Sequence, residues 1–284
     1  MRLRSFLLSA IITLSVLCGV VANDTVTTQD VEISGNHVMT GNYTVSQGTT
    51  LSINPGTVID MQDYWMKIDG TLIADNATIM STIQTTDEGS NNAGVWDSLT
   101  ISQGGFANLD NTTIRNAISC INVEGILNAK SLTMRDCLVG MAVAGEAEIT
   151  TMSIESVKNY GLLISGSASV TDVSLTDMTT GIASTGKLVL TDGDFSQTGI
   201  GVSLSDGDAE VEDLNFTSGV GTAVSISSTV SGDITGMTGS SVNAIVATDA
   251  SSFSFSNINM SGQRLINSWS AGNLSISSVV YNST

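Results

Sequence analysis

Glycine residues recur along this chain at a nearly constant interval. Gly125, Gly145, Gly166, Gly186 and Gly207 are each separated from the next by 20 or 21 residues. A fixed period of this length is typical of solenoid proteins, in which each repeat packs mainly on its two neighbours. The interval constrains the fold strongly, because every other residue can be aligned to it.

Aligning the units on these glycines reveals three ladders, by which we mean columns of apolar side chains at one repeat position. The first ladder is an alternating pair after the glycine, such as Leu188 and Leu190. The second is a single residue farther along, such as Phe195, and the third is an alternating pair such as Val202 and Leu204. Alternation is typical of strands with one buried face, so each unit predicts three short strands.

The register extends outward from these units and predicts about eleven coils of 20–22 residues. Gly70 and Gly104 are 34 residues apart, and the surplus predicts a loop insertion near residues 85–94. Between Thr229 and Gly272 the register is less regular, so we expect this end to be looser.

Stacking such units pairs each strand with its copy in the next coil and predicts an all-β, single-stranded parallel solenoid. A leucine-rich repeat has an overlapping period and is the structural alternative. Its Asn or Cys column would here read Ala117, Cys137, Val157 and Met178, of which only Cys137 fits. The third ladder also favours a third strand over a helical return.

The first 22 residues have the pattern of a secretory signal peptide. Arg2 and Arg4 precede an apolar run from Phe6 to Ala22, which ends in small residues. Cleavage leaves a β-helix domain of residues 23–284, and a retained anchor is the alternative. We therefore expect a secreted or extracellular surface protein with no membrane insertion beyond this segment.

The formal net charge of −18 results from few basic residues, since 9 Lys and Arg face 27 Asp and Glu. A surface of this sign repels phosphate backbones and anionic headgroups, so we predict no nucleic-acid partner. Export would allow Cys120 and Cys137 to pair. The repeat register places Cys137 beside Ala117, three residues from Cys120, which predicts a separation too large for a disulfide.

Two segments resemble a known family. Residues 41–75, GNYTVSQGTTLSINPGTVIDMQDYWMKIDGTLIAD, and residues 111–125, NTTIRNAISCINVEG, resemble coils of secreted proteins of the pectin-lyase-like superfamily. The resemblance implies a right-handed parallel β-helix and frequent carbohydrate binding or cleavage at the cell surface. The superfamily also contains many members with no known activity, so function does not follow from the fold.

The residues with catalytic potential form one small group. Arg115, Arg135 and Glu155 follow the second ladder on adjacent coils. The lyases of the superfamily imply a calcium site with an Arg or Lys base, and Arg115 or Arg135 is the candidate. The interpretation we favour is a solvent-exposed column in which Glu155 pairs with Arg135. The single histidine, His37, is expected to be solvated.

Acidic residues recur at the turn between the first and second strands. Asp172, Asp192 and Asp213 occupy this turn, and Asp194 lies on a neighbouring strand. Asp tolerates left-handed backbone, so we favour a role in turn formation. A calcium site is the alternative, because a hard cation would relieve the repulsion among the carboxylates. We expect no other cofactor.

The chain is therefore predicted to be a non-catalytic β-helix module for structural display or for recognition of a glycan or surface protein. A calcium-assisted polysaccharide lyase and a self-assembling envelope component that oligomerises through its end coils are the alternatives. Tyr64, Trp65 and Trp96 are candidates both for stacking on a sugar ring and for filling the core, and the sequence leaves that choice open.

Overall fold

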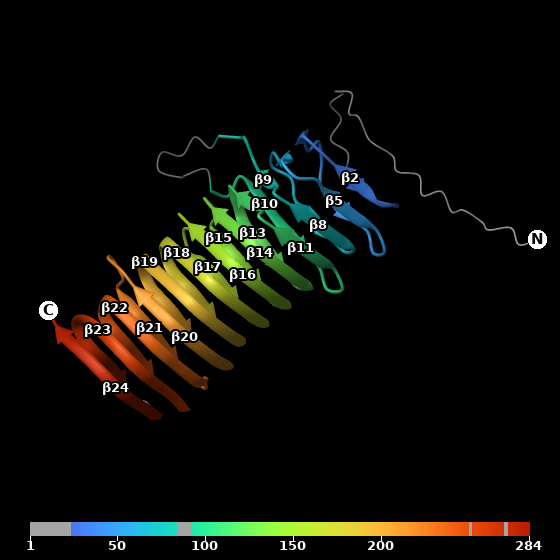
Figure 1. Ribbon diagram of the computed structural model, residues 1–284. Coiled ribbons are helices and arrows are strands. Elements are labelled where there is room, and N and C mark those ends of the chain that lie inside the picture. The colour runs from blue at the N-terminus through green and yellow to red at the C-terminus, as the bar shows by residue number, and fades with distance from the viewer. Residues whose placement is uncertain (1–23, 85–92, 250–251, 270–271) are drawn as a thin grey trace, which may run out of the picture.

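The protein is a rod of stacked coils (Figure 1). The computed structural model describes residues 24–84, 93–249, 252–269 and 272–284. Within these ranges 24 strands form one sheet system, and no helix is present. The predicted signal peptide, residues 1–22, and most of the predicted insertion near 85–94 lie outside the described residues. No helix in the described ranges is long and apolar enough to span a membrane.

The strands up to the insertion are β1 (Thr25–Val26), β2 (Val31–Ile33), β3 (Asn36–Val38), β4 (Tyr43–Val45), β5 (Thr50–Ile53), β6 (Val58–Asp60), β7 (Met66–Ile68), β8 (Thr71–Asp75) and β9 (Thr78–Met80). The next are β10 (Trp96–Ile101), β11 (Phe106–Asp110), β12 (Thr113–Arg115), β13 (Ala117–Val123), β14 (Ile126–Arg135), β15 (Val139–Val143), β16 (Glu146–Glu155) and β17 (Tyr160–Ile164). The last are β18 (Ser167–Ser184), β19 (Lys187–Leu204), β20 (Asp208–Phe216), β21 (Thr222–Ser227), β22 (Ser231–Thr248), β23 (Ser252–Trp269) and β24 (Asn273–Ser283).

Each strand pairs in parallel with its copy one coil away, so the predicted register is confirmed. Strand β14, for example, pairs with β16 through Leu127↔Ala147, Ala129↔Ile149 and Met134↔Ile154. Strand β2 pairs with β5 and adds a coil before those predicted, which brings the total to about 12 coils. The fold is that of a right-handed parallel β-helix, with three faces that we number by the order of the strands in a coil.

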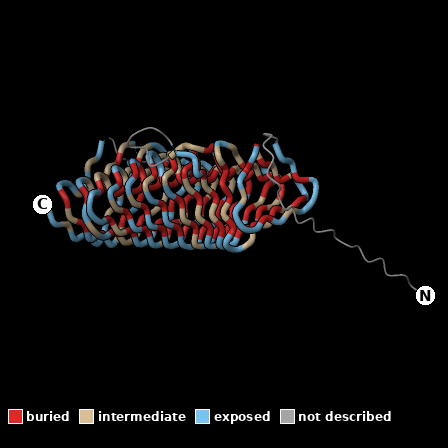
Figure 2. Tube along the Cα trace, turned by 90° about the horizontal axis from the view of Figure 1, so that it is seen from above, coloured by how far each residue is buried: buried red, intermediate tan, exposed pale blue. Residues whose placement is uncertain are grey.

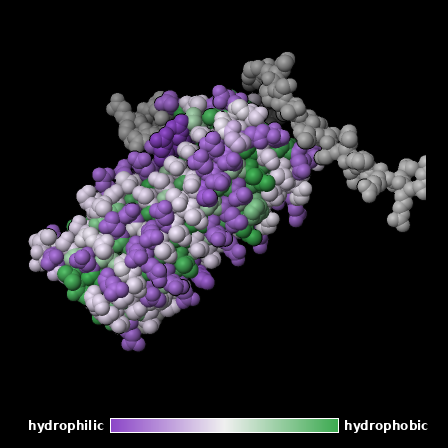
Figure 3. Space-filling view, viewed as in Figure 1, coloured by the Kyte–Doolittle hydropathy of each residue, from purple (hydrophilic) through white to green (hydrophobic). Residues whose placement is uncertain are grey.

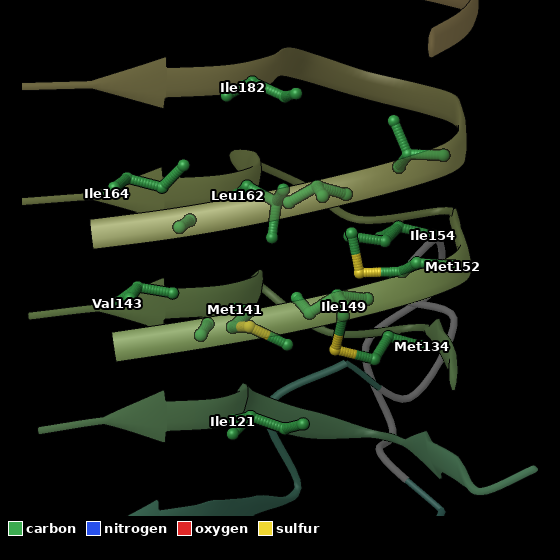
Figure 4. Packing of buried hydrophobic residues seen from close by; sticks show 14 of the residues in the cluster. Ile121, Met134, Met141, Val143, Ile149, Met152, Ile154, Leu162, Ile164 and Ile182 are labelled. Carbon is green, nitrogen blue, oxygen red and sulfur yellow. The ribbon is translucent and has the colours of Figure 1, made fainter. Parts of the chain in front are cut away.

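The ladders fill the interior of the rod. Figure 2 shows buried positions running continuously along its length, and Figure 4 shows Ile121, Met141, Leu162 and Ile182 stacked in successive coils. All four side chains are fully buried. Because each ladder residue packs on its counterpart above and below, the core is continuous along the middle of the rod.

The turn between the first and second strands depends on residues that accept a left-handed backbone. Asp172, Asp192 and Asp213 have φ angles of 57°, 58° and 54°, and Asn111 has 45°. Asn and Asp adopt this conformation more readily than other non-glycine residues. The predicted structural role of the three aspartates in the turn is confirmed.

Cys120 and Cys137 form a disulfide with a Cα–Cα distance of 5.9 Å, so the prediction that they stay apart was wrong. That prediction treated the chain from Ala117 to Cys120 as extended. The register instead shifts opposite Cys120, since Ser98 pairs with Ser119 and Leu99 pairs with Ile121. This bulge bends the strand at the corner between the second and third faces. The bend directs Cys120 toward the next coil.

Small residues occupy this corner in later coils: Gly140, Gly161, Gly181, Gly201, Ala223 and Ala244. A Cβ atom at Gly181 would lie 2.9 Å from Cδ1 of Phe195, and one at Gly201 would lie 2.5 Å from Cε1 of Phe216. The large second-ladder side chains therefore take the space that a corner side chain would need.

The last coils keep the parallel pairing, although glycine interrupts their ladders. Gly232 pairs with Phe253 and Gly239 with Met260 in the β22–β23 register. Phe253 and Met260 are buried, whereas Leu274 in β24 is only partly buried. The irregularity predicted for this end thus affects the packing of the ladders more than the pairing of the strands.

Candidate functional site

The register brings Arg115, Arg135 and Glu155 together on the second face. Arg115 pairs with Arg135 in the β12–β14 register, and Arg135 pairs with Glu155 in the β14–β16 register. All three side chains point away from the core, as the residue that follows a buried ladder position must. We call these residues the arginine column. Their predicted stacking on adjacent coils is confirmed.

The contacts within the arginine column differ from the expected ion pair. Arg135 Nε lies 4.0 Å from Oδ2 of Asp136, so Arg135 pairs with Asp136 and not, as expected, with Glu155. The Nε and Nη2 atoms of Arg115 approach Sδ of Met80 at 3.2 and 2.8 Å. Both guanidinium groups therefore contact side chains of their own or adjacent coils.

Asp136 lies beside the arginine column, and its carboxyl has a shifted pKa. Burial raises the pKa of its carboxyl, Arg135 and Arg115 oppose this shift, and the charge of Glu155 adds to it. The pKa remains above its usual value because burial outweighs the two arginines. A carboxyl with a raised pKa beside two cations is a group that proton-transfer chemistry can use.

Trp96 does not face solvent. Its exposed fraction is 0%, and its Nε1 atom donates a hydrogen bond of 2.8 Å to the carbonyl oxygen of Arg115. Trp96 is therefore a core residue that helps to hold the backbone behind the arginine column. Tyr64 is partly buried against the core, and Trp65 is half-buried.

His37, in β3, is half-buried, contrary to the expected solvated position. Burial lowers the pKa of its imidazole from the usual value, because the charged form loses solvation.

The four aspartates considered for calcium line one depression on the rod. This acidic hollow has a volume of about 260 Å³, and its lining residues are Asp172, Asp192, Gly193, Asp194, Asp213, Leu214, Asn215, Gly236 and Thr238. Three aspartates come from the turn column, and Asp194 comes from the second face. The stacking of β18, β19 and β20 is what brings these residues together.

Hydrogen bonds fix part of the acidic hollow. Nδ2 of Asn215 donates to Oδ1 of Asp194 at 2.8 Å, and the hydroxyl of Thr238 donates to Oδ1 of Asn215 at 3.3 Å. A Cβ atom at Gly236 would lie 2.3 Å from Oδ1 of Asp213, so glycine is what leaves room for that carboxylate. The hollow combines carboxylate acceptors with hydroxyl and amide groups, which together suit a ligand rich in hydroxyls.

No group of three or more His, Cys, Asp or Glu side chains in the described parts of the chain is arranged to hold a metal ion. The four aspartates of the acidic hollow, Asp172, Asp192, Asp194 and Asp213, therefore form no such group.

Several residues of the acidic hollow are not evident from the sequence. Asn215 and Thr238 are outward residues of the second strand, and the repeat alignment would have placed them in the same column as Asp194, one and two coils farther along. Gly193 stands in a buried column that holds Val173 and Leu214 in the adjacent coils, and Gly236 stands where the preceding coils have the turn aspartate. Because glycine has no side chain, these two positions leave space for a depression. A search of the sequence for reactive or charged residues does not reveal such a space.

Comparison with solved structures found other β-helices. Two are the A-modules of the Azotobacter vinelandii mannuronan C-5 epimerases AlgE4 and AlgE6, with TM-scores of 0.52 and 0.54 and 10% sequence identity. Those alignments cover 90% and 92% of this chain and 88% and 87% of the modules. A family 28 exopolygalacturonase of Yersinia enterocolitica gives a TM-score of 0.50 at 11% identity, covering 88% of this chain and 72% of that one.

These neighbours are pectin-lyase-like parallel β-helix proteins, so the fold implied by the sequence resemblance is confirmed. At 10–11% identity the likeness establishes the fold alone. No protein-family model and no curated protein sequence matches the chain.

Proposed function

We propose that this protein is a non-catalytic recognition module, displayed outside the cell, which binds neutral glycans in the acidic hollow. The observation that carries the proposal is the chain of hydrogen bonds from Thr238 through Asn215 to Asp194 beside three further carboxylates. Sugar hydroxyls donate to carboxylates and accept from amides, and a rigid arrangement reduces the entropy lost on binding. The negative charge disfavours acidic sugars.

The disulfide supports an extracellular location. Structural disulfides persist in oxidising compartments and are rare in the cytosol, where thiols are kept reduced. The Cys120–Cys137 bond therefore agrees with export by residues 1–22. The carbohydrate-acting neighbours are consistent with a glycan ligand, although each of those activities belongs to the neighbour named.

A glycan array probed with the purified protein tests the proposal. We expect Asn215→Ala to weaken binding to neutral glycans at least tenfold, because it removes the amide that orients Asp194. Asn259→Ala is the matched control, since Asn259 occupies the same outward column two coils farther along, outside the acidic hollow. Equal loss in both variants, or no binding by the wild type, would overturn the proposal.

A polysaccharide lyase is the second candidate, favoured by Asp136 and its raised pKa beside Arg115 and Arg135. Incubating the protein with polyuronates and calcium, and recording the absorbance of unsaturated products, separates the two functions. We expect no turnover. Turnover that Arg135→Ala abolishes would overturn the non-catalytic proposal and assign the activity to the arginine column.

A further inference from the structure

The third face of the rod differs from the other two in charge. Its strands from coil to coil are β13, β15, β17, the last residues of β18 and β19, β21, and the last residues of β22. These seven segments, within residues 117–248, contain no Asp, Glu, Lys, Arg or His. We call this surface the neutral face. Over these seven coils a chain with a net charge of −18 thus has one side whose strands carry no charge, whereas the coils before and after them carry Lys67, Asp97 and Arg264 on the same face.

The first face of the same coils is charged. Its outward positions include Glu146 and Glu148 in β16, and Glu210 and Glu212 in β20. The face visible in Figure 3 is mostly hydrophilic or intermediate, with hydrophobic residues confined to small patches. Two copies of the rod that approached through such faces would bring like charges together, which costs free energy.

Apolar side chains are exposed on the neutral face. Ile118 is 46% exposed, Val242 is 45% exposed, and Tyr160 and Leu163 are each 38% exposed. Between them lie small outward residues, such as Ala183. Charged residues return in the adjoining turns, so the arrangement is an uncharged, partly apolar centre with a charged rim, as in protein–protein interfaces.

We propose that the neutral face is the interface between two copies of this chain, packed side by side. The net charge of the chain favours a second copy as the partner. On the neutral face, two strongly anionic rods can meet without bringing like charges together. Seven strands spaced by about 4.8 Å extend over roughly 34 Å, and five residues of a strand cover roughly 16 Å. The pair would bury about 1,100 Å², near the lower limit of stable interfaces, so the dimer is expected to be weak.

This dimer is distinct from an end-to-end oligomer formed through the end coils. A lateral interface has two-fold symmetry and closes on itself, whereas stacking through end coils continues without limit. The acidic hollow belongs to the first–second turn and to the second face, so lateral pairing leaves it open. The dimer therefore does not depend on the proposed glycan binding.

Analytical ultracentrifugation over a range of protein concentrations tests the proposal. We expect a reversible monomer–dimer equilibrium. Leu163→Glu and Ala183→Glu should each raise the dissociation constant of the dimer at least tenfold. Val189→Glu is the matched control: Val189 is a half-buried outward residue of the first face, and its change adds the same charge. Raising the ionic strength from about 0.01 to about 1 M should strengthen the dimer, because repulsion is screened while the neutral interface is not weakened.

Circular dichroism and thermal unfolding would establish that the three variants remain folded, since all three positions face outward. A wild-type protein that is monomeric at every concentration would overturn the proposal. So would a dimer that Leu163→Glu and Ala183→Glu leave intact, because its interface would then lie on another surface. A series of species that grows with concentration would assign association to the end coils instead.

Discussion

The middle coils, from β11 to β19, and the last coils, from β22 to β24, use the same ladders but cover them to different degrees. In the middle, Leu188 is buried between Ala168 and Ala209 of the adjacent coils. In β24, Leu274 occupies the same ladder position with a described coil on one side only, and it is partly buried. A position in a solenoid repeat therefore does not by itself determine how much a residue stabilises the fold.

This difference follows from the linear character of the solenoid. Each coil contacts its neighbours alone, so stability is approximately the sum of the stability of each coil and of the interfaces between coils. The middle coils also carry the Cys120–Cys137 disulfide, whereas the last coils have glycine at two ladder positions. We therefore expect the last coils to unfold at lower free energy than the middle ones.

The largest expected effect comes from the same substitution in both regions. Leu188→Ala should lower the free energy of unfolding by roughly 2–5 kcal/mol, because it leaves a cavity in a closed core. Leu274→Ala removes the same atoms from a partly exposed site and should cost less than about 1 kcal/mol. Urea unfolding followed by circular dichroism measures both. Equal losses in the free energy of unfolding would show that Leu274 is covered to the same degree as Leu188. That result would contradict the difference between the last and the middle coils.

The disulfide provides the next test. Replacing both Cys120 and Cys137 with Ala should lower the free energy of unfolding by about 3 kcal/mol, the usual value for a closed loop of about 15 residues. Hydrogen exchange should quicken in the middle coils and stay unchanged in β23 and β24. A reducing agent should destabilise the wild type and leave the double variant unaffected. Detection of free thiols at both positions in the native protein would contradict the assignment.

The features that recur along the chain could be predicted from the sequence, and those that occur once could not. The ladders, the parallel register and the turn aspartates recur in many coils, and each recurrence strengthens the inference. The disulfide depends on a single bulge at Cys120, which an alignment that assumes regular strands cannot show. The burial of Trp96 was left undecided for the same reason, because the adjoining insertion interrupts the repeat.

The candidate sites divide in the same way. The alignment correctly placed Arg115, Arg135 and Glu155 on neighbouring coils, since this follows from the register. It gave Arg135 the wrong partner, because ion pairing depends on side-chain conformation at the turn, where Asp136 lies closer. The acidic hollow requires Gly193 and Gly236, whose contribution is the space that they leave.

The corner between the second and third faces allows the finest comparison of the two regions. Gly181 in the middle and Ala244 in β22 occupy the same column. Gly181→Ala should cost about 1–3 kcal/mol, because the new Cβ would lie 2.9 Å from Cδ1 of Phe195 and 2.5 Å from the carbonyl oxygen of Gly201. Ala244→Gly should cost only about 0.5–1 kcal/mol, mainly through backbone entropy.

Combining Gly181→Ala with Phe195→Leu shows how much of the first cost comes from the ring. If Phe195 is the main obstacle, the double variant should be more stable than the sum of the single effects predicts, by more than about 0.5 kcal/mol. Additive effects would assign the cost to the carbonyl of Gly201 instead. In that case the middle coils require glycine because the backbones of adjacent coils lie too close for a Cβ atom. The alanines of the later coils would then indicate a wider separation of the backbones there.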